Sequence, residues 1–391
     1  MNGINDFKIL VVDDEVDLES LVRQKFRKQI REGKYDFVFA LNGVEALARI
    51  IEFPEIGIVL SDINMPEMDG LTLLARLKEL KNTRLKTVIV SAYGDMDNIR
   101  EAMNRGAFDF ITKPINFTDL EITIDKTIEE VILMRHSIEV QEKLISIQQD
   151  LNTAREIQQA ILPKSFPPFP DIYSFDIFAS MVSAKEVGGD FFDFFLIDAN
   201  RLGFVVGDVS GKGVPAAIFM AITRTLIRAS GIRGASAVQC ISTVNRLLCK
   251  ESASGMFVTV FYGILNIKQG YVEYVNAGHS PPYVISESGI KSLELTSGLA
   301  LGVLEDFEFT SKIIRLNPVE QLFLFSDGVT EAFNWQNEVF GEERLLNSLS
   351  RKFGKSVETI VDEVLEEVNE FSAGIPQSDD ITLLAITYKG H

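Results

Sequence analysis

The chain has 391 residues, of which 46% are hydrophobic and 24% charged, so it is long enough for two or three domains with buried cores. With 38 Lys and Arg against 56 Asp and Glu, its formal net charge of −18 argues against nucleic acid or an anionic membrane as the main partner. The chain has only two cysteines, which is too few for a disulfide framework and fits a reducing cytosol. Their surroundings also lack the spacing of metal ligands. No apolar run reaches the roughly 18 residues of a membrane span, and the first residues do not form a signal peptide, so we expect a cytoplasmic protein.

The first segment, residues 1–116, alternates short apolar runs with amphipathic stretches. The apolar runs predict five strands, and the stretches predict helices between them, the first over Val16–Ile30. Strict alternation of strand and helix predicts an α/β doubly wound domain on a five-stranded parallel sheet. We expect the strands at 7–12, 36–40, 56–61, 86–91 and 108–112, and the other helices at 44–52, 71–80 and 97–105.

Polar residues stand where the predicted strands of this segment end. Asp13 and Asp14 follow the first strand, Asp62 the third, Ser91 closes the fourth and Lys113 follows the fifth. Because the carboxyl ends of parallel strands share one edge of a sheet, we expect three carboxylates and an ammonium to lie together there. Such oxygens suit Mg²⁺, and a carboxylate beside Mg²⁺ and a lysine can attack a phosphoryl group to form an aspartyl phosphate. The alternative is that each Asp only caps the next helix.

The motifs around these positions carry a resemblance. The segment resembles the receiver domains of two-component response regulators in the stretches 11–15, 61–66, 69–70, 91–92 and 112–115. The resemblance implies that Asp62 accepts a phosphoryl group from a cognate histidine kinase, and that Lys113 binds its oxygens just before a cis peptide at Pro114. It assigns the receiver Mg²⁺ ligands to Asp13, Asp14, Asp62 and the Asn64 carbonyl, and the switch pair to Ser91 and Phe110.

Residues 117–165 are predicted to form a long helical linker, because no Pro or Gly interrupts the chain between Pro114 and Pro163. If about 45 residues are helical, the rod is roughly 65 Å long. Its apolar stripe has the spacing of a heptad seam and no partner within so short a linker, so we expect a parallel homodimeric coiled coil. The alternative is that the helix packs on one of the chain's own domains. The seam consists of Val140, Leu144, Ile147, Leu151, Ala154, Gln158 and Ile161.

The third segment, residues 166–391, follows a cluster of prolines and shows strands in runs and helices in runs. This order predicts an α+β domain, which we expect to contain a two-sheet antiparallel β-sandwich flanked by helices. Strands are expected at 175–182, 191–196, 202–207, 257–265, 271–276, 282–285, 321–325 and 381–388. Helices are expected at 215–230 and 235–249, with two more before the last strand.

Four turns that carry Asp abut predicted strands of this segment, at 188–193, 207–213, 326–331 and 378–382. No cluster of His or Cys competes for metal. Asp190, Asp208, Asp327 and Asp379 could therefore hold two hard cations, with a bridging water aligned with phosphorus.

Other polar residues of the third segment allow two interpretations each. A lone Asp at a strand end is more often a turn former, which is the interpretation we favour for Asp193 and Asp380. Lys212 could contact a phosphate or remain solvated. His279 could shuttle a proton, although a structural turn is the better interpretation. Trp335 is expected in the core.

The third segment resembles the metal-dependent, PPM-type serine/threonine phosphatases, in the branch of the sporulation and stress-response phosphatases. The resemblance covers about residues 150–390 and includes the stretch 154–163 as well as the four Asp motifs. It implies a protein phosphatase with two Mn²⁺ or Mg²⁺ ions and a substrate such as a phosphorylated STAS-type anti-sigma-factor antagonist. No residue matches the phosphate-binding arginine of the eukaryotic relatives. The implied ligands are Asp190, Asp208, the Val209 carbonyl, Asp327 and Asp379, with Asp380 as the alternative to Asp379.

Two other classes of protein must be weighed against the phosphatase. The stretch 188–192 superficially resembles the signature of diguanylate cyclases, but Phe191 replaces its Glu and the other three Asp motifs are foreign to that family. The non-enzyme alternative is a receiver-gated binding module with an inactive phosphatase-like domain, against which the intact acidic quartet argues. The sequence thus predicts a response regulator in which phosphorylation of Asp62 controls a phosphatase.

Overall fold

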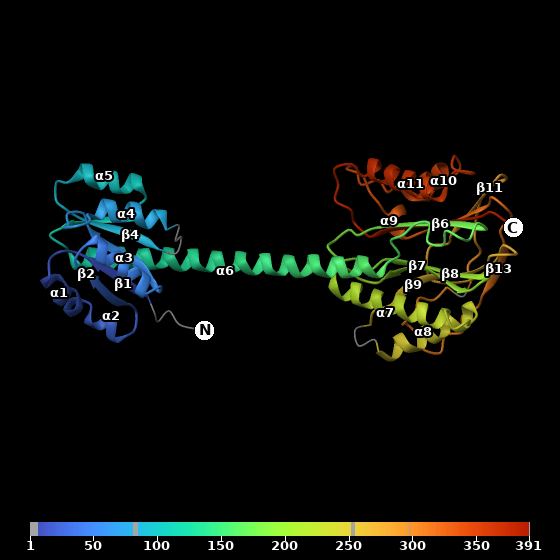
Figure 1. The fold of residues 1–391 in the computed structure, drawn as a ribbon, viewed down its shortest axis with the longest axis horizontal. Coiled ribbons are helices and arrows are strands. Elements are labelled where there is room, and N and C mark those ends of the chain that lie inside the picture. The colour runs from blue at the N-terminus through green and yellow to red at the C-terminus, as the bar shows by residue number, and fades with distance from the viewer. Residues whose placement is uncertain (1–6, 81–84, 252–254, 297, 391) are drawn as a thin grey trace. The chain divides into compact units, whose positions relative to one another are not determined.

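The computed structural model describes residues 7–80, 85–251, 255–296 and 298–390. The chain divides into two compact units, Met1–Ser146 and Ile147–His391. The boundary lies within one helix, α6 (Phe117–Ile161), which is uninterrupted over 45 residues (Figure 1). Among the helices of the described residues, none combines the length and the apolar character that crossing a bilayer requires.

The N-terminal unit is built on a parallel sheet of five strands in the order β2-β1-β3-β4-β5 (Figure 1). Helices cover both faces of the sheet, so the central strands carry apolar side chains on both faces and are buried along almost their whole length. The predicted α/β doubly wound fold is confirmed. The strands are β1 (Lys8–Val12), β2 (Asp36–Ala40), β3 (Ile56–Asp62), β4 (Lys86–Ala92) and β5 (Asp109–Lys113).

The predicted helix over Val16–Ile30 is wrong in one respect, because it is divided at Phe26. There the backbone leaves helical geometry, and the Phe26 ring packs against Tyr35 and Phe37 in the core. Residues of α1 and of the start of α6 are buried on one face of the sheet, and residues of α3 and α4 on the other. The helices are α1 (Asp17–Lys25), α2 (Arg27–Arg31), α3 (Gly43–Glu52), α4 (Gly70–Glu79) and α5 (Met96–Arg105).

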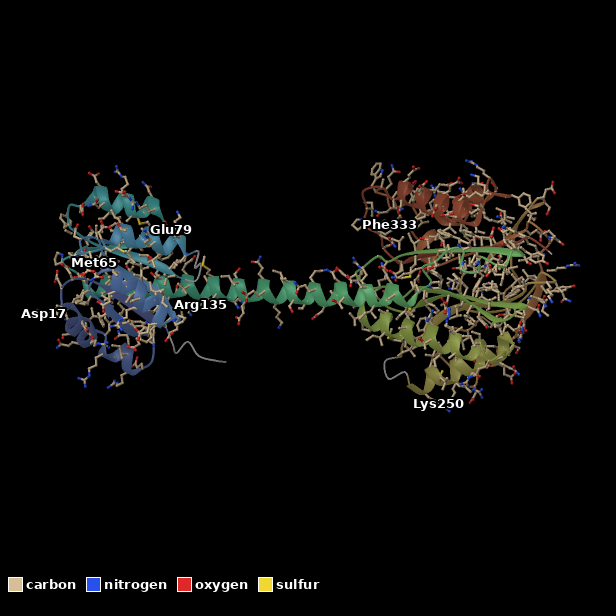
Figure 2. All side chains as sticks on the ribbon, viewed as in Figure 1. Asp17, Met65, Glu79, Arg135, Lys250 and Phe333 are labelled. Atoms are coloured by element: carbon tan, nitrogen blue, oxygen red, sulfur yellow. The ribbon has the colours of Figure 1, made fainter. Side chains whose placement is uncertain are left out.

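Helix α6 is anchored to the N-terminal unit by its first turns. Leu120 and Ile124 are buried against α1 and the sheet. The Arg135 guanidinium lies 4.7 Å from the centre of the Phe7 ring. Figure 2 labels Arg135 on this helix. Farther along, the apolar seam residues Val140, Leu144 and Ile147 are exposed on the single chain. An apolar face of this kind is available for a partner helix.

The C-terminal unit contains two five-stranded antiparallel sheets. Their orders are β13-β10-β9-β8-β7 and β12-β11-β14-β15-β6. The strands of the first sheet are β7 (Phe191–Asp198), β8 (Arg201–Val209), β9 (Val258–Asn266), β10 (Tyr271–Ala277) and β13 (Lys312–Arg315). Those of the second are β6 (Phe175–Val182), β11 (Tyr283–Ser286), β12 (Gly289–Ser292), β14 (Gln321–Phe325) and β15 (Ile381–Tyr388).

Helices flank both outer faces of this sandwich, as predicted. Figure 1 shows α7 (Val214–Gly231) and α8 (Ala237–Glu251) beside the first sheet, and α10 (Gly341–Leu349) and α11 (Val357–Phe371) beside the second. A larger core lies between the sheets and under α7 and α8, and a second core lies under α10 and α11. A short helix, α9 (Asp327–Thr330), follows β14. The sequence did not predict β12 and β13, which have four residues each and are largely exposed.

Candidate functional site

The carboxylates of Asp13, Asp14 and Asp62 meet at the carboxyl edge of the N-terminal sheet, with oxygens within 4.8 Å of one another. Asp13 follows β1, and Asp62 ends the neighbouring strand β3. Asp13 and Asp62 are buried, whereas Asp14 is exposed. This set of oxygen donors, open to solvent on one side, suits a hard divalent cation that keeps some of its waters. The residues therefore fit the Mg²⁺ ion that the sequence predicts.

Lys113 points into the same cluster. Its Nζ atom lies 2.7 Å from Asp62 Oδ2 and 2.9 Å from Asp13 Oδ2. Burial opposes the positive charge of Lys113, but the hydrogen bonds to Asp62 and Asp13 outweigh that effect and raise the pKa of the lysine. The side chain stays cationic where a phosphoryl group on Asp62 would need a positive partner.

The structure also places the other residues implied by the receiver resemblance. Ser91 is buried near the carboxyl end of β4, and Phe110 is partly exposed on the neighbouring strand β5. Asn64 is exposed, two residues beyond Asp62. The peptide bond before Pro114 is cis, as the resemblance implied.

In the C-terminal unit, the four predicted metal-binding aspartates come from four separate segments and interact electrostatically. Asp190 precedes β7, Asp208 lies near the end of β8, Asp327 begins α9 and Asp379 precedes β15. Burial, and then the charge of Asp208, raise the pKa of Asp190. Burial, Asp327 and Asp379 raise the pKa of Asp208 to about 7. A bound cation would relieve the repulsion among these carboxylates.

Several features at these turns test whether the residues fit a metal. Asp190 is buried, and no hydrogen-bond donor among the described residues reaches its Oδ2 atom. A buried carboxylate oxygen without a partner costs free energy that a divalent cation would offset. The Val209 carbonyl oxygen would lie 3.0 Å from a Cβ atom at Gly189, so glycine leaves this predicted ligand uncrowded. The donor set contains only oxygen, which suits Mg²⁺ or Mn²⁺.

Asp379 and Asp380 have different surroundings, which bears on the choice that the sequence left open. Asp380 is buried, and its carboxylate accepts backbone hydrogen bonds from Ala184 (2.8 Å), Gly189 (2.6 Å) and Asp190 (3.3 Å). Asp379 is only half-buried and makes no comparable set of backbone hydrogen bonds. Asp380 therefore builds the turn that carries Asp190, and the geometry favours Asp379 as the ligand.

Asp193 is not a turn former, which corrects the interpretation from sequence. It lies within β7 and is fully buried, with Oδ2 2.8 Å from Arg224 Nε and 2.9 Å from Arg228 Nε. Both arginines belong to α7. A buried charge needs partners of opposite charge. The two arginines of α7 supply them for Asp193 and so fix the helix against β7.

His279 occupies a buried turn. Its Nδ1 atom lies 3.0 Å from Thr259 Oγ1, and its backbone N–H donates to Asn276 Oδ1 at 2.8 Å. The Asn276 amide donates back to the His279 carbonyl at 2.9 Å. Burial lowers the pKa of His279 to about 4, so the ring is neutral near pH 7. These contacts support the structural interpretation over a proton shuttle.

Gln158 belongs to the predicted seam, but the structure gives it another role. It is 5% exposed, its Nε2 donates to the Gly188 carbonyl at 2.7 Å, and its Oε1 accepts the Gly188 N–H at 3.1 Å. Glycine is required at 188 because a Cβ atom there would lie 2.3 Å from Asp380 Oδ2. The seam prediction is wrong at this position, because the amide pairs with backbone instead of a second helix. A polar residue at an otherwise apolar seam position was the available signal.

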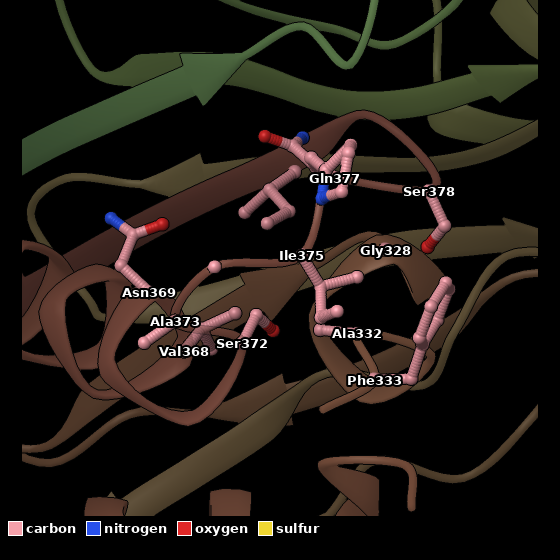
Figure 3. Close-up of a pocket in the computed structure, with 13 residues that line it drawn as sticks. Gly328, Ala332, Phe333, Val368, Asn369, Ser372, Ala373, Ile375, Gln377 and Ser378 are labelled. Carbon is pink, nitrogen blue, oxygen red and sulfur yellow. The ribbon is translucent and has the colours of Figure 1, made fainter. Parts of the chain in front are cut away.

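A pocket of about 140 Å³ adjoins these acidic turns (Figure 3). Its walls include Gly328, which follows Asp327, and Ser378, which precedes Asp379. Phe333, in the segment after α9, also lines the pocket.

Trp335 is 74% exposed, so its predicted place in the core is wrong. It sits in a loop that Asn334 fixes, since Asn334 Oδ1 accepts backbone hydrogen bonds from Gln336 and Glu338, both at 3.0 Å. This turn chemistry holds the indole outside the core.

Comparisons with known proteins assign both units. Residues 9–125 match the family model of the response regulator receiver domain, and residues 198–389 match that of stage II sporulation protein E (SpoIIE). The chain belongs to the response regulators and carries a SpoIIE-type phosphatase domain. Asp208, Asp327 and Asp379 fall within the range matched by the phosphatase model, and Asp190 lies before it.

Individual relatives agree with this assignment. The phosphoserine phosphatase RsbU of Bacillus subtilis is 26% identical over 276 residues, which cover 69% of this chain and 81% of RsbU. Protein IcfG of Synechocystis is 33% identical over 264 residues, which cover 61% of this chain but only 41% of IcfG. The solved SiaA-PP2C domain of Pseudomonas aeruginosa shares the fold, with a TM-score of 0.56 and 21% identity over 63% of this chain and 99% of that domain.

Proposed function

We propose that this response regulator is a phosphoserine/phosphothreonine protein phosphatase controlled by phosphorylation of Asp62. The observation that carries the proposal is the electrostatic interaction of Asp208 with Asp190, Asp327 and Asp379, with the buried Asp190 Oδ2 atom left without a hydrogen-bond partner in the described structure. A binding module without catalysis would have no need for such crowding.

In the phosphatase domain, Asp190, Asp208, Asp327 and Asp379 would hold two Mn²⁺ or Mg²⁺ ions, together with the Val209 carbonyl. When bound, the two ions would activate a water for attack on phosphorus and offset charge on a phosphoryl oxygen. The protein's own contribution is to fix the ligands. Asp380 does so through its hydrogen bonds to the 188–190 turn, which hold Asp190 in a buried position.

In the receiver domain, the Asp62 carboxylate would attack the phosphoryl group supplied by a histidine kinase. Asp13, Asp14 and the Asn64 carbonyl would join Asp62 in holding Mg²⁺, and Lys113 would bind the transferred oxygens. Ser91 and Phe110 would then change position on phosphorylation and alter the outer face of β4 and β5. Their place on the adjacent strands β4 and β5 supports this assignment.

We further propose a division into a receiver domain (1–116), a linker (117–165) and a phosphatase domain (166–391). The linker would form a parallel coiled coil in a homodimer through Leu144, Ile147 and neighbouring seam residues, whose exposure supports the idea. Its far end contacts the turn before Asp190 through Gln158, so a change in the linker could reach the phosphatase site. Light scattering on the phosphorylated protein checks the dimer, which a strict monomer would contradict.

The substrate would be a phosphoprotein such as a STAS-type anti-sigma-factor antagonist. The similarity to RsbU, a phosphoserine phosphatase by name, supports a phosphoserine substrate. The acidic surplus of the chain supports a protein substrate rather than nucleic acid.

The test is hydrolysis of a phosphoserine protein with Mn²⁺ and without it. Asp208→Asn and Asp327→Asn should each lower the rate by at least about a hundredfold, because a two-ion site fails when a ligand is lost. Asp198→Asn is the matched control, since Asp198 is an exposed residue paired with Arg201 on the surface. Activity that survives both ligand substitutions, or an inactive wild-type protein, would favour the binding module instead.

A further inference from the structure

Lys212 reaches the acidic turns of the phosphatase domain. Its Nζ atom lies 2.9 Å from Asp379 Oδ2 and donates a hydrogen bond to the Ser378 carbonyl at 2.6 Å. Lys212 belongs to the loop between β8 and α7, only four residues beyond Asp208. The cation therefore contacts one predicted ligand directly and follows another closely in sequence.

Two glycines flank Lys212 in this loop, and its side chain is partly exposed. Gly211 and Gly213 flank it with φ angles of +90° and +79°, and no heavy atom would lie within 4 Å of a Cβ at either position. The side chain of Lys212 is 42% exposed. An exposed pair of this kind contributes little to stability, so Lys212 can leave Asp379 at small cost.

The charge of the site explains what such a lysine is needed for. Four ionised aspartates and two divalent cations are close to neutral together, so they supply little net attraction for a phosphoserine that carries roughly −1.5 to −2 charges. Two arginines of α7, the helix that follows this loop, do not fill this need, because Arg224 and Arg228 are both paired with the buried Asp193. The Lys212 ammonium, which lies beside Asp379, is a positive charge placed where a phosphate could meet it.

We infer that Lys212 binds the phosphoryl group of the substrate, and that it pairs with Asp379 when no phosphate is present. The inference rests on the proposed phosphatase function and names a residue that orients the phosphate. In this role Lys212 takes the place of the phosphate-binding arginine for which the sequence offers no match. The lysine would donate to a non-bridging oxygen of the phosphoryl group, so its loss weakens phosphate binding more than it weakens metal binding.

The experiment compares Lys212→Met and Lys212→Arg with the wild-type full-length protein. Inhibition by inorganic phosphate and the KM for para-nitrophenyl phosphate are measured with saturating Mn²⁺, and Mn²⁺ affinity is measured separately by calorimetry. Loss of one charge-assisted hydrogen bond should raise the inhibition constant and KM by roughly 10-fold to 100-fold in Lys212→Met. Lys212→Arg, which keeps the charge, should recover part of that loss. Mn²⁺ affinity should stay the same or increase, because a competitor for Asp379 has been removed.

The control is Lys312→Met, since Lys312 forms a surface ion pair with Glu294 on the edge strand β13. Unchanged phosphate inhibition in Lys212→Met would overturn the inference, as would a fall in Mn²⁺ affinity that accounts for the lost activity. If the wild-type protein hydrolyses neither para-nitrophenyl phosphate nor a phosphoserine protein, the proposed phosphatase function itself is refuted. An active wild type with an unchanged Lys212→Met variant refutes only the role of Lys212.

Discussion

Lys113 places its Nζ atom 2.7 Å from Asp62 Oδ2 at the carboxyl edge of the receiver sheet. The two residues end strands β5 and β3, which are separated by β4. Asp62 is buried and Lys113 is three-quarters buried, so the pair is shielded from solvent and its attraction is less screened than on the surface. Asp14, the third carboxylate of this cluster, is exposed. Because Lys113 also lies 2.9 Å from Asp13 Oδ2, a labelling experiment is needed to tell which carboxylate accepts the phosphoryl group.

Acetyl phosphate with Mg²⁺ should label the protein once, and Asp62→Asn should abolish the label, because an amide cannot act as the nucleophile. Mass spectrometry of the intact protein measures the label. Asp97→Asn, a change in an exposed residue of α5, should be labelled as the wild type is. Labelling that persists in Asp62→Asn would show that another carboxylate accepts the phosphoryl group.

Exchanging Asp379 and Asp380 for Asn separates metal binding from folding. Asp380→Asn places an amide group against backbone N–H donors of the 188–190 turn, and should destabilise the metal-free protein by about 1–3 kcal/mol. Asp379→Asn should leave that stability near the wild-type value and weaken Mn²⁺ binding by tenfold or more. Urea unfolding without metal and calorimetry with Mn²⁺ measure the two effects. The opposite pattern would make Asp380 the ligand.

Mn²⁺ affinity should fall as the solution is acidified through pH 7. Burial and neighbouring carboxylates raise the pKa of Asp208 to about 7 in the metal-free protein, so below that value the ion must displace a proton. Each proton displaced weakens apparent binding by about tenfold per pH unit. Calorimetry in two buffers of different ionisation enthalpy counts the protons released, and affinity that is level between pH 6 and 8 would contradict the shift.

The same shift has a consequence for stability. Because the pKa of Asp208 is raised in the folded state above its ordinary value of 3.8, the folded protein binds more protons than the unfolded chain between roughly pH 4 and 7. This contribution to stability is present at acidic pH and is lost as the pH rises through 7. Asp208→Asn removes it, so the stability gained by that variant over the wild type should be larger at pH 8 than at pH 5.

Gln158 is the contact through which the linker should act on the phosphatase site. Gln158→Leu keeps the size of the side chain but removes both hydrogen bonds to Gly188, and should lower phosphatase activity by about tenfold or more. Labelling of Asp62 should not change. Gln149→Leu, an exposed position on the same helix, serves as control. Full activity in Gln158→Leu, still responsive to the receiver, would exclude this contact from signalling.

The fold and the acidic positions were predictable because they rest on local patterns. Buried parallel strands give continuous apolar runs, so the residues that follow them, such as Asp13 and Asp62, mark one edge of the sheet. The same reasoning found Asp208 and Asp327 beside apolar strands. This reasoning missed strands β12 and β13, because they are short, exposed edge strands. Without a buried face, their sequences do not alternate between apolar and polar residues.

What the sequence could not give depends on contacts between distant residues. Asp379 and Asp380 differ only because the carboxylate of Asp380 meets backbone N–H groups of the turn at Gly189, far away in sequence. Gln158 joins a helix to a turn thirty positions away in the same manner. No periodicity encodes such pairings.

The measurement that tests the account most directly is the rate of Mn²⁺-dependent phosphoserine hydrolysis by the full-length protein, with and without beryllofluoride. Beryllofluoride imitates the phosphoryl group on Asp62, so the account predicts that it changes the rate several-fold in the wild type and has no effect on Asp62→Asn. Both proteins should bind Mn²⁺ equally in the phosphatase domain. Equal rates with and without beryllofluoride in the wild type, under conditions where Asp62 is fully occupied, would contradict control of the phosphatase by the receiver.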